Sequence, residues 1–314
     1  MNIKNKNYMK KILGITLLVG ILASCSDSDE HFEPGTNNNE IRLTSKVSFA
    51  RSAYDTQLNS GNKVGFYVTE WLDGATKGDP AVKNLYSNVE LTADGKGYFD
   101  YGTSMYYPSS GNKVDFYAYH PYQSSAPADV TAIPFSINDD QTKLANYLAS
   151  DLLWANNDGV NRNNTIVPIE FKHKLSKLEF TIKKGNGTDL QNLNKVEVLQ
   201  VLPNTTLNLT DGSITEAGGT PVNVNALGIK GTIEETLTGG EAIIIPQTIG
   251  SDEKLLQVSL GDVSFSFKPG KETKFESGKK YKYIITINMG GIEVSSSIVD
   301  WIAEDPTEGN GIMD

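Results

Sequence analysis

The chain has 314 residues, 38% of them apolar, which allows one large domain or two of ordinary size with a sizeable core. A net charge of −10 and an isoelectric point near 4.9 exclude an electrostatic attraction to nucleic acid or to anionic lipid headgroups, so nucleic acid is not an expected partner. Cys25 is the only cysteine, which excludes a disulfide within one chain and a cysteine metal site.

Residues 1–24 have the features of a bacterial lipoprotein signal peptide. Four lysines precede an apolar segment of 12 residues, 12–23, whereas a membrane-spanning helix needs about 20. The segment ends in Leu22-Ala23-Ser24-Cys25, which resembles the lipobox before which signal peptidase II cleaves. We therefore expect the thiol of Cys25 to carry a lipid that anchors the chain in the outer membrane. An ordinary secretory peptide with an incidental cysteine is the weaker alternative.

Residues 25–40 are expected to form a flexible acidic tether. Their composition of Ser, Asp, Glu, Gly, Pro and Asn cannot bury a core. The acidic run at 26–30 (SDSDE) resembles the surface-export signal of lipoproteins in gut and oral Gram-negative anaerobes. A plain solvated linker is the alternative interpretation of that run. Such a tether would reach at most about 50 Å.

After residue 40 the chain shows the period-2 alternation of β-strands. In the first run, residues 41–49, one face carries Ile41, Leu43, Ser45, Val47 and Phe49. Further alternating runs occur at 64–68, 114–120, 178–182, 196–198, 243–245, 256–260, 263–267, 281–287 and 292–294. Turn residues such as Ser60-Gly61-Asn62 separate the runs. Only 139–153 has helical spacing, which predicts one short helix or a long crossover.

This pattern predicts an all-β protein built of two β-sandwiches in tandem. The expected domains are 41–168 and 169–314, because residues 156–164 resemble a loop and a new series of strands begins at 169.

Motifs of catalysis are absent from the sequence. It contains no His-Glu-x-x-His, no P-loop, no Gly-x-Ser-x-Gly and no Rossmann glycine triplet, so no enzyme activity, cofactor or metal is expected. His120 lies in an apolar alternation and is expected to be packed, and His173 is expected to be a strand residue with a hydrogen-bond partner. Nine aromatic residues between 98 and 122 favour core and cross-strand packing over an exposed sugar-binding platform.

Several segments together resemble the fimbrillins, which are the subunits of type V pili, and their relatives, in gut and oral Gram-negative anaerobes. In chain order they are 41–51, 60–67 (SGNKVGFY), 106–108 (YYP), 114–121 (VDFYAYHP), 151–153 (DLL), 171–176 (FKHKLS), 278–287 and 299–301 (VDW). Asn62 replaces the usual Asp of the second segment. The resemblance spans nearly the whole chain. It implies two transthyretin-like β-sandwiches, a place on the cell surface or in a fimbrium, and other fimbrial subunits as partners.

The resemblance also implies a mechanism in which an arginine-specific protease removes the first strand and a strand of another subunit fills the groove. Arg51 is the expected cleavage site, because it follows the first run and precedes a polar stretch. Arg42 is the second choice, since it lies inside the run, and cleavage at neither is the remaining alternative. The apolar side chains of the removable strand are Ile41, Leu43, Val47 and Phe49.

The last residues, 302–314, make a poor donor strand because they contain Pro306, glycines and acidic residues. A tip or accessory subunit is therefore favoured over a polymerising stalk subunit. The alternative is a standalone surface lipoprotein, an adhesin that binds a host glycan or protein and never polymerises.

Overall fold

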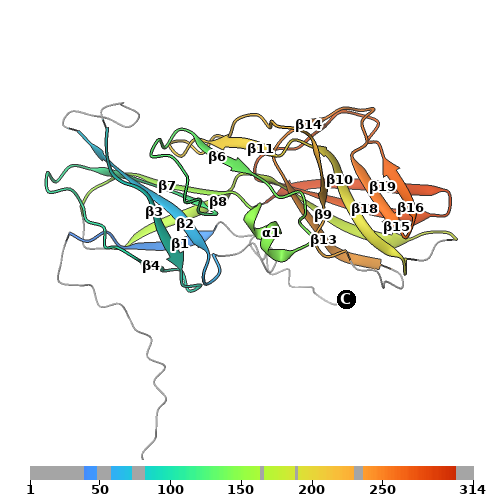
Figure 1. The fold of residues 1–314 in the computed structure, drawn as a ribbon, viewed down its shortest axis with the longest axis horizontal. Coiled ribbons are helices and arrows are strands. Elements are labelled where there is room, and N and C mark those ends of the chain that lie inside the picture. The colour runs from blue at the N-terminus through green and yellow to red at the C-terminus, as the bar shows by residue number, and fades with distance from the viewer. Residues whose placement is uncertain are drawn as a thin grey trace, which may run out of the picture. The chain divides into compact units, whose positions relative to one another are not determined.

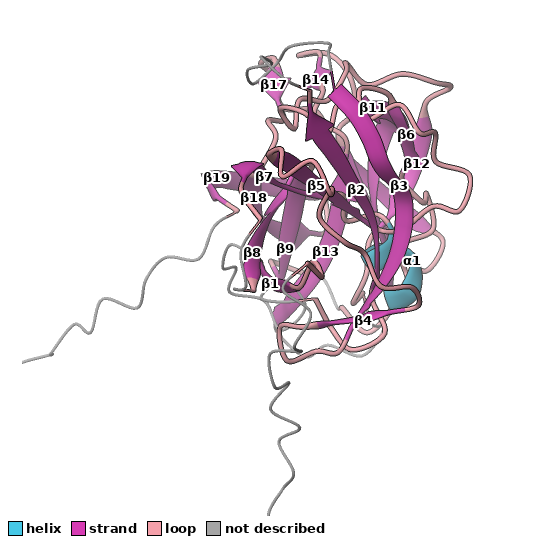
Figure 2. Ribbon diagram, turned by 90° about the vertical axis from the view of Figure 1, so that its left-hand side faces the viewer, coloured by secondary structure: helices cyan, strands magenta, loops and turns pink. Residues whose placement is uncertain are grey.

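The computed structural model describes residues 39–47, 58–72, 82–162, 166–187, 190–229 and 236–301. The described residues belong to one compact unit. Nearly every regular element is a β-strand (Figure 1), and the described residues contain one short helix, α1 (Leu144–Ala149), which is cyan in Figure 2. The prediction of an all-β protein is confirmed.

A seven-stranded sheet is built from the earlier part of the chain, in the order β1-β8-β7-β5-β2-β3-β4. Neighbouring strands are antiparallel except β1 and β8, which run parallel. β1 is therefore the outermost strand on one side. The strands are β1 (Leu43–Val47), β2 (Lys63–Trp71), β3 (Val82–Ala93), β4 (Phe99–Tyr101), β5 (Val114–His120), β7 (Leu153–Val160) and β8 (Val167–His173).

One face of this sheet covers a group of apolar side chains that we call the first core. Each is at most 4% exposed. The members are Ile41, Leu43, Val47, Leu58, Val64, Phe66, Val68, Leu91, Ala93, Phe99, Met105, Tyr107, Val114, Phe116, Ala118, Leu153, Ala155, Val167, Ile169 and Phe171.

The remaining strands form two four-stranded sheets, β12-β10-β15-β16 and β13-β9-β18-β19, and two short pairs, β11-β6 and β14-β17. The strands are β6 (Ile133–Ser136), β9 (Ser176–Lys184), β10 (Leu193–Val201), β11 (Asn204–Leu207), β12 (Val222–Asn225), β13 (Thr236–Ile244), β14 (Thr248–Ile249), β15 (Leu256–Leu260), β16 (Val263–Phe267), β17 (Thr273–Lys274), β18 (Lys279–Asn288) and β19 (Gly291–Asp300).

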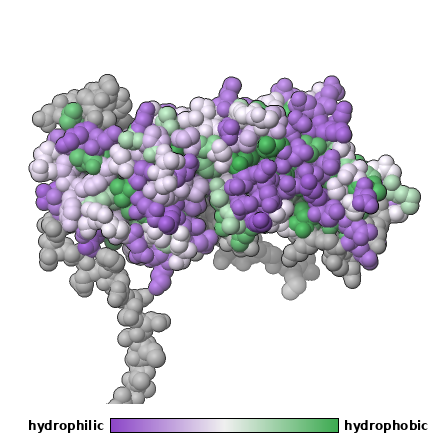
Figure 3. All heavy atoms as spheres, in the orientation of Figure 1, coloured by the Kyte–Doolittle hydropathy of each residue, from purple (hydrophilic) through white to green (hydrophobic). Residues whose placement is uncertain are grey.

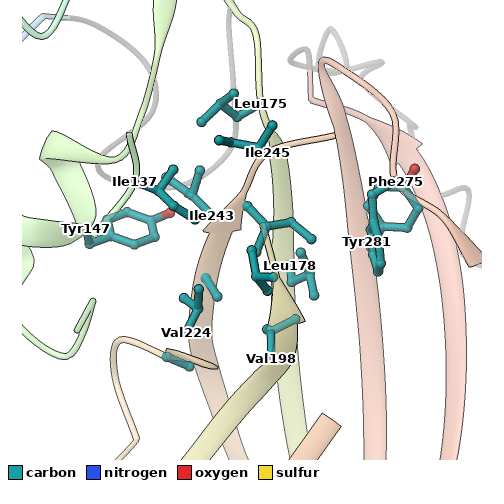
Figure 4. Packing of buried hydrophobic residues seen from close by; sticks show 14 of the residues in the cluster. Ile137, Tyr147, Leu175, Leu178, Val198, Val224, Ile243, Ile245, Phe275 and Tyr281 are labelled. Atoms are coloured by element: carbon teal, nitrogen blue, oxygen red, sulfur yellow. The ribbon is translucent and has the colours of Figure 1, made fainter. Parts of the chain in front are cut away.

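We call the buried apolar side chains of these strands the second core. It also includes residues from earlier in the chain, such as Tyr119, Tyr147 and Trp154. Figure 4 shows Leu178 and Val198 close together in it, with Ile137 and Tyr147 beside Ile243. Leu178 of β9 is paired with Ala242 of β13, so the next residue of β13, Ile243, points to the opposite face of the sheet. Both Leu178 and Ile243 are buried, so this sheet buries apolar side chains on both faces.

β5 lies between the two cores, and all seven of its residues are buried. Phe116 and Ala118 belong to the first core, whereas Tyr117 and Tyr119 belong to the second. Both faces of β5 are therefore packed. Its side chains alternate between the two cores, whereas those of a strand at the surface alternate between a core and solvent.

Residues 133–149 pack with the second core although they precede β7 and β8 in the chain. β6 pairs with β11, and the Tyr147 side chain of α1 is 1% exposed. The amide of Gln141 bonds the main chain of Ile243 twice, through Nε2 to the carbonyl (2.7 Å) and through Oε1 from the N–H (2.8 Å). Within 139–153, where the sequence has helical spacing, the structure has one short helix, α1, of six residues.

The prediction of a loop at 156–164 is wrong for residues 156–160, because β7 continues to Val160. The Asp115 carboxylate accepts a hydrogen bond from the N–H of Gly159 (2.6 Å), and β7 pairs with β5 along this stretch. The boundary predicted between 168 and 169 falls inside β8, which belongs to the seven-stranded sheet. The division into two transthyretin-like domains stays a prediction.

Candidate functional site

β1 contributes its inward side chains to the first core. Leu43 and Val47 of the strand, and Ile41 just before it, are 1–2% exposed. The strand pairs with β8 along its whole length, so that Leu43 lies beside Val167 and Val47 beside Phe171. A short strand at the sheet margin therefore supplies part of the core.

β8 forms the surface against which β1 packs. Val167, Ile169 and Phe171 are buried, while the alternate residues of the strand are exposed. Its outer main-chain edge bonds β1, as in the hydrogen bond from the N–H of Val167 to the carbonyl of Arg42 (2.8 Å). Without β1, these apolar side chains and hydrogen-bonding groups would lose their partner.

The segment 97–105, which includes the short strand β4, runs along the other edge of β1. The N–H of Ser45 donates to the carbonyl of Gly97 (2.7 Å), and the N–H of Leu43 donates to the hydroxyl of Tyr101 (2.7 Å). Burial raises the pKa of Tyr101 to about 12. β1 is thus held from both sides, on one of them by only scattered bonds.

Arg42 lies directly before β1 and is tied to its surroundings. Its Nη2 is 3.0 Å from Oε2 of Glu40, and Ser104 donates to the other oxygen of Glu40 (2.8 Å). The hydrogen bonds from Ser104 and Arg42 lower the pKa of Glu40. Since the carbonyl of Arg42 is also bonded to β8, a protease would have to pull this backbone out of the sheet to cut it.

The comparisons with known proteins decide the family. The family model described as "Fimbrillin-like" matches residues 50–301, from just beyond β1 to the residue after β19.

This chain belongs to the fimbrillin-like family. It is 28% identical over 319 residues to a protein of Bacteroides uniformis named as a fimbrium subunit, Fim1C, with 96% of this chain and 97% of that protein covered. A crystal structure from Bacteroides uniformis described as a cell adhesion protein has 25% identity and a TM-score of 0.60, covering 83% of this chain and 98% of that one. The tip fimbrial protein Mfa3 of Porphyromonas gingivalis shares the fold alone, with 12% identity, a TM-score of 0.50 and coverage of 83% and 99%.

The aromatic-rich stretch of this fimbrillin-like chain is mainly core. Of its nine aromatic residues, Tyr98 and Tyr106 are exposed. Phe99, Tyr107, Phe116, Tyr117 and Tyr119 are buried. On the face shown in Figure 3, hydrophobic residues occur in small groups among hydrophilic ones. These observations favour packing over a stacking platform for sugars.

Both strand histidines occupy packed sites, as the sequence predicted. Nδ1 of His120 is 2.8 Å from the carbonyl of Lys63, and burial lowers the pKa of His120. Nδ1 of His173 is 2.8 Å from Oδ1 of Asp151, and its ring stacks on Trp301 at 3.9 Å between centroids.

Several predicted site residues lie outside the described residues, namely Cys25, Phe49 and Arg51. Within the described ranges, no group of three or more His, Cys, Asp and Glu side chains is placed to hold a metal ion. The same ranges contain no helix long and apolar enough to cross a membrane.

Two features of the structure escaped the sequence analysis. One is the closure of β1 by Gly97 and Tyr101, for which the tyrosine-rich stretch was the only signal. The other is a buried charge cluster on the sheet of β9. There, Nζ of Lys177 is 3.2 Å from Glu241 and 3.6 Å from Glu179. Lysine and glutamate at alternate positions of a strand suggest an exposed face, which made this burial hard to foresee.

Proposed function

We propose that this fimbrillin-like chain is a non-enzymatic subunit of a surface fimbrium that assembles by strand exchange. In this account, β1 is removed and an extended strand of another subunit takes its place beside β8. The observation that carries the proposal is the position of β1, an outermost parallel strand. Its side chains Leu43 and Val47, with Ile41 just before the strand, complete the first core. The fimbrium subunit named among its relatives gives further support.

Loss of β1 would create an acceptor groove with two complementary features. The edge of β8 offers main-chain donors and acceptors in the spacing of a strand, and Val167, Ile169 and Phe171 offer an apolar row at alternate positions. A donor segment with apolar residues at every second position satisfies both, which is β-augmentation.

We propose that the precursor reaches the surface as a lipoprotein anchored through Cys25 and that cleavage follows Arg51. The bonds made by the carbonyl and guanidinium of Arg42 argue against cleavage there. Cleavage after Arg51 would remove the whole of β1 together with the tether and the anchor.

Mass spectrometry of the mature protein from the surface of its native cells tests this processing. The expected N-terminus is Ser52 for the natural chain and for an Arg42→Ala control, whereas Arg51→Ala is expected to retain β1. A natural chain that begins at lipidated Cys25 would contradict the cleavage step and would leave an anchor subunit or an independent lipoprotein.

A tip or accessory position follows from the poor donor properties of residues 302–314, since a tip subunit accepts a strand but need not donate one. We expect immunogold labelling of fimbriae to place this protein at fibre ends. Label spread evenly along the fibres would instead indicate a stalk subunit.

The alternative is a lipid-anchored adhesin that keeps β1 and binds a host glycan or protein. It is supported by a surface hollow of about 600 Å³ whose lining combines apolar residues such as Phe275 with the polar residues Glu216, Gln247 and Lys274. An intact lipidated N-terminus together with the absence of the protein from fimbriae would favour this function.

A further inference from the structure

β19 is a long outer strand with little protection. It forms one side of the sheet β13-β9-β18-β19, and among the described strands it pairs with β18 alone, from Asn288↔Gly291 to Lys279↔Asp300. It is ten residues long and contains no proline, no lysine and no register shift. Natural proteins usually protect an edge strand with a proline, a lysine or a β-bulge, because an open edge is a template for another strand.

The hydrogen-bond pattern shows which residues face outward. The N–H of Trp301 donates to the carbonyl of Gly278 (2.7 Å), so the odd-numbered residues of β19 exchange bonds with β18. The N–H and C=O groups of Ile292, Val294, Ser296 and Ile298 therefore point away from the sheet.

The same even-numbered residues carry the side chains on the core-facing side. They lie opposite the alternate residues of β18 from Tyr281 to Ile287, which are buried. Ile298 is nevertheless 60% exposed. A core-facing isoleucine in solvent indicates that none of the described residues covers the sandwich at this point.

The neighbouring strand of the facing sheet shows the same lack. β16 lies beside β19 at the margin of its own sheet (Figure 1). Its Val263 is 56% exposed, and Phe265 and Phe267 are only partly buried against the second core. One added strand next to β19 would cover part of this apolar margin.

We propose that β19 pairs antiparallel with β19 of a second copy of this chain, centred on Ser295. The pattern of the strand is self-complementary in this register. Ile292 lies opposite Ile298 of the second copy, and Val294 lies opposite Ser296. Glu293 faces a serine, Ser297, so no like charges oppose each other. The two sheets join into one across a two-fold axis, as closed homodimers require.

We propose a second copy as the partner of β19 because the strand matches itself. In this register isoleucine lies opposite isoleucine, and the glutamate lies opposite a serine hydroxyl. A register shifted by one residue would place the outward N–H and C=O groups of one strand opposite odd-numbered residues of the other. The main-chain groups of those residues already bond β18, so this register is excluded. β19 belongs to a different sheet from β1 and β8, so its test is independent of strand exchange at β8.

Proline substitution separates the outer edge of β19 from its inner edge. The N–H of Ser296 points outward, so Ser296→Pro removes a donor to the second copy and none to β18. Ser296→Ala is the matched control. We use the chain from residue 25 with Cys25→Ser, which contains the whole compact unit. Sedimentation velocity is expected to show a dimer whose fraction rises with concentration for the parent and for Ser296→Ala, and a monomer for Ser296→Pro.

Cysteine cross-linking tests the register and does not depend on the proline variant folding. In the proposed pairing, Ser295 faces Ser295 of the second copy at a Cα separation of roughly 4.5 Å, within disulfide range. Ser295→Cys is expected to form a covalent dimer under mild oxidation at least about tenfold more readily than Ser297→Cys, whose symmetry mate is four residues away in register. Equal cross-linking of the two variants, a parent chain that stays monomeric at every concentration, or a dimer unaffected by Ser296→Pro in a folded chain would overturn the proposal.

Discussion

A chain that begins at Ser52 is expected to lose cooperative folding and to associate with itself. It lacks Ile41, Leu43 and Val47, each of which stabilises the folded state by about 1.5–3 kcal/mol through burial. Their sum, about 5–9 kcal/mol as an upper estimate, approaches the whole stability of a typical domain, about 5–15 kcal/mol. Urea denaturation followed by tryptophan fluorescence measures the loss against a chain that begins at Glu40.

Rescue by a peptide distinguishes an open groove from general damage. A synthetic peptide of residues 40–51 is expected to restore a cooperative transition when added to the chain that begins at Ser52. The same peptide with Leu43→Glu and Val47→Glu is expected to fail, because it would bury two carboxylates in the first core. Equal denaturation midpoints for the chains that begin at Glu40 and Ser52 would contradict the structural role of β1.

Lys177→Met is expected to lower the free energy of unfolding by about 3–5 kcal/mol, which is the usual cost of removing one partner from a buried ion pair. The Lys177 side chain is 0% exposed and lies 3.2 Å from Oε2 of Glu241. Glu241 also lies directly opposite Glu179 in the sheet, so the substitution leaves two neighbouring carboxylates with less compensation. Lys280 still bonds Glu179 (3.0 Å), and Tyr147 still donates to Glu241 (2.6 Å). Urea denaturation with a check of the m-value measures the effect.

Two variants control for the loss of a lysine as such. Lys279→Met removes an exposed ion pair with Asp300, which is expected to contribute little to stability because solvent screens it. Combining Lys177→Met with Glu241→Gln is expected to recover part of the stability, because the buried negative charge is then gone. If Lys177→Met cost no more than Lys279→Met, the buried cluster would not contribute as its geometry indicates.

The β5 and β7 strands illustrate how far alternation carries a prediction. The run 114–120 predicted a strand correctly, since alternation is a property of the local sequence. The run 156–164 looked like a loop because asparagine, aspartate and glycine disfavour strands in isolation. It became strand as far as Val160 because β5 supplies pairing partners and Asp115 binds the N–H of Gly159.

The sequence alone determined the all-β class, the resemblance to the fimbrillins and the buried face of the first strand. These follow from side-chain periodicity and motif order, which are local. Tertiary structure decided that β1 runs parallel to β8, that residues 97–105 close its other edge and that Lys177 is buried. It also decided that β19 pairs with β18 alone among the described strands. Each of these depends on which distant segments meet, and a period-2 pattern fits any partner strand equally well.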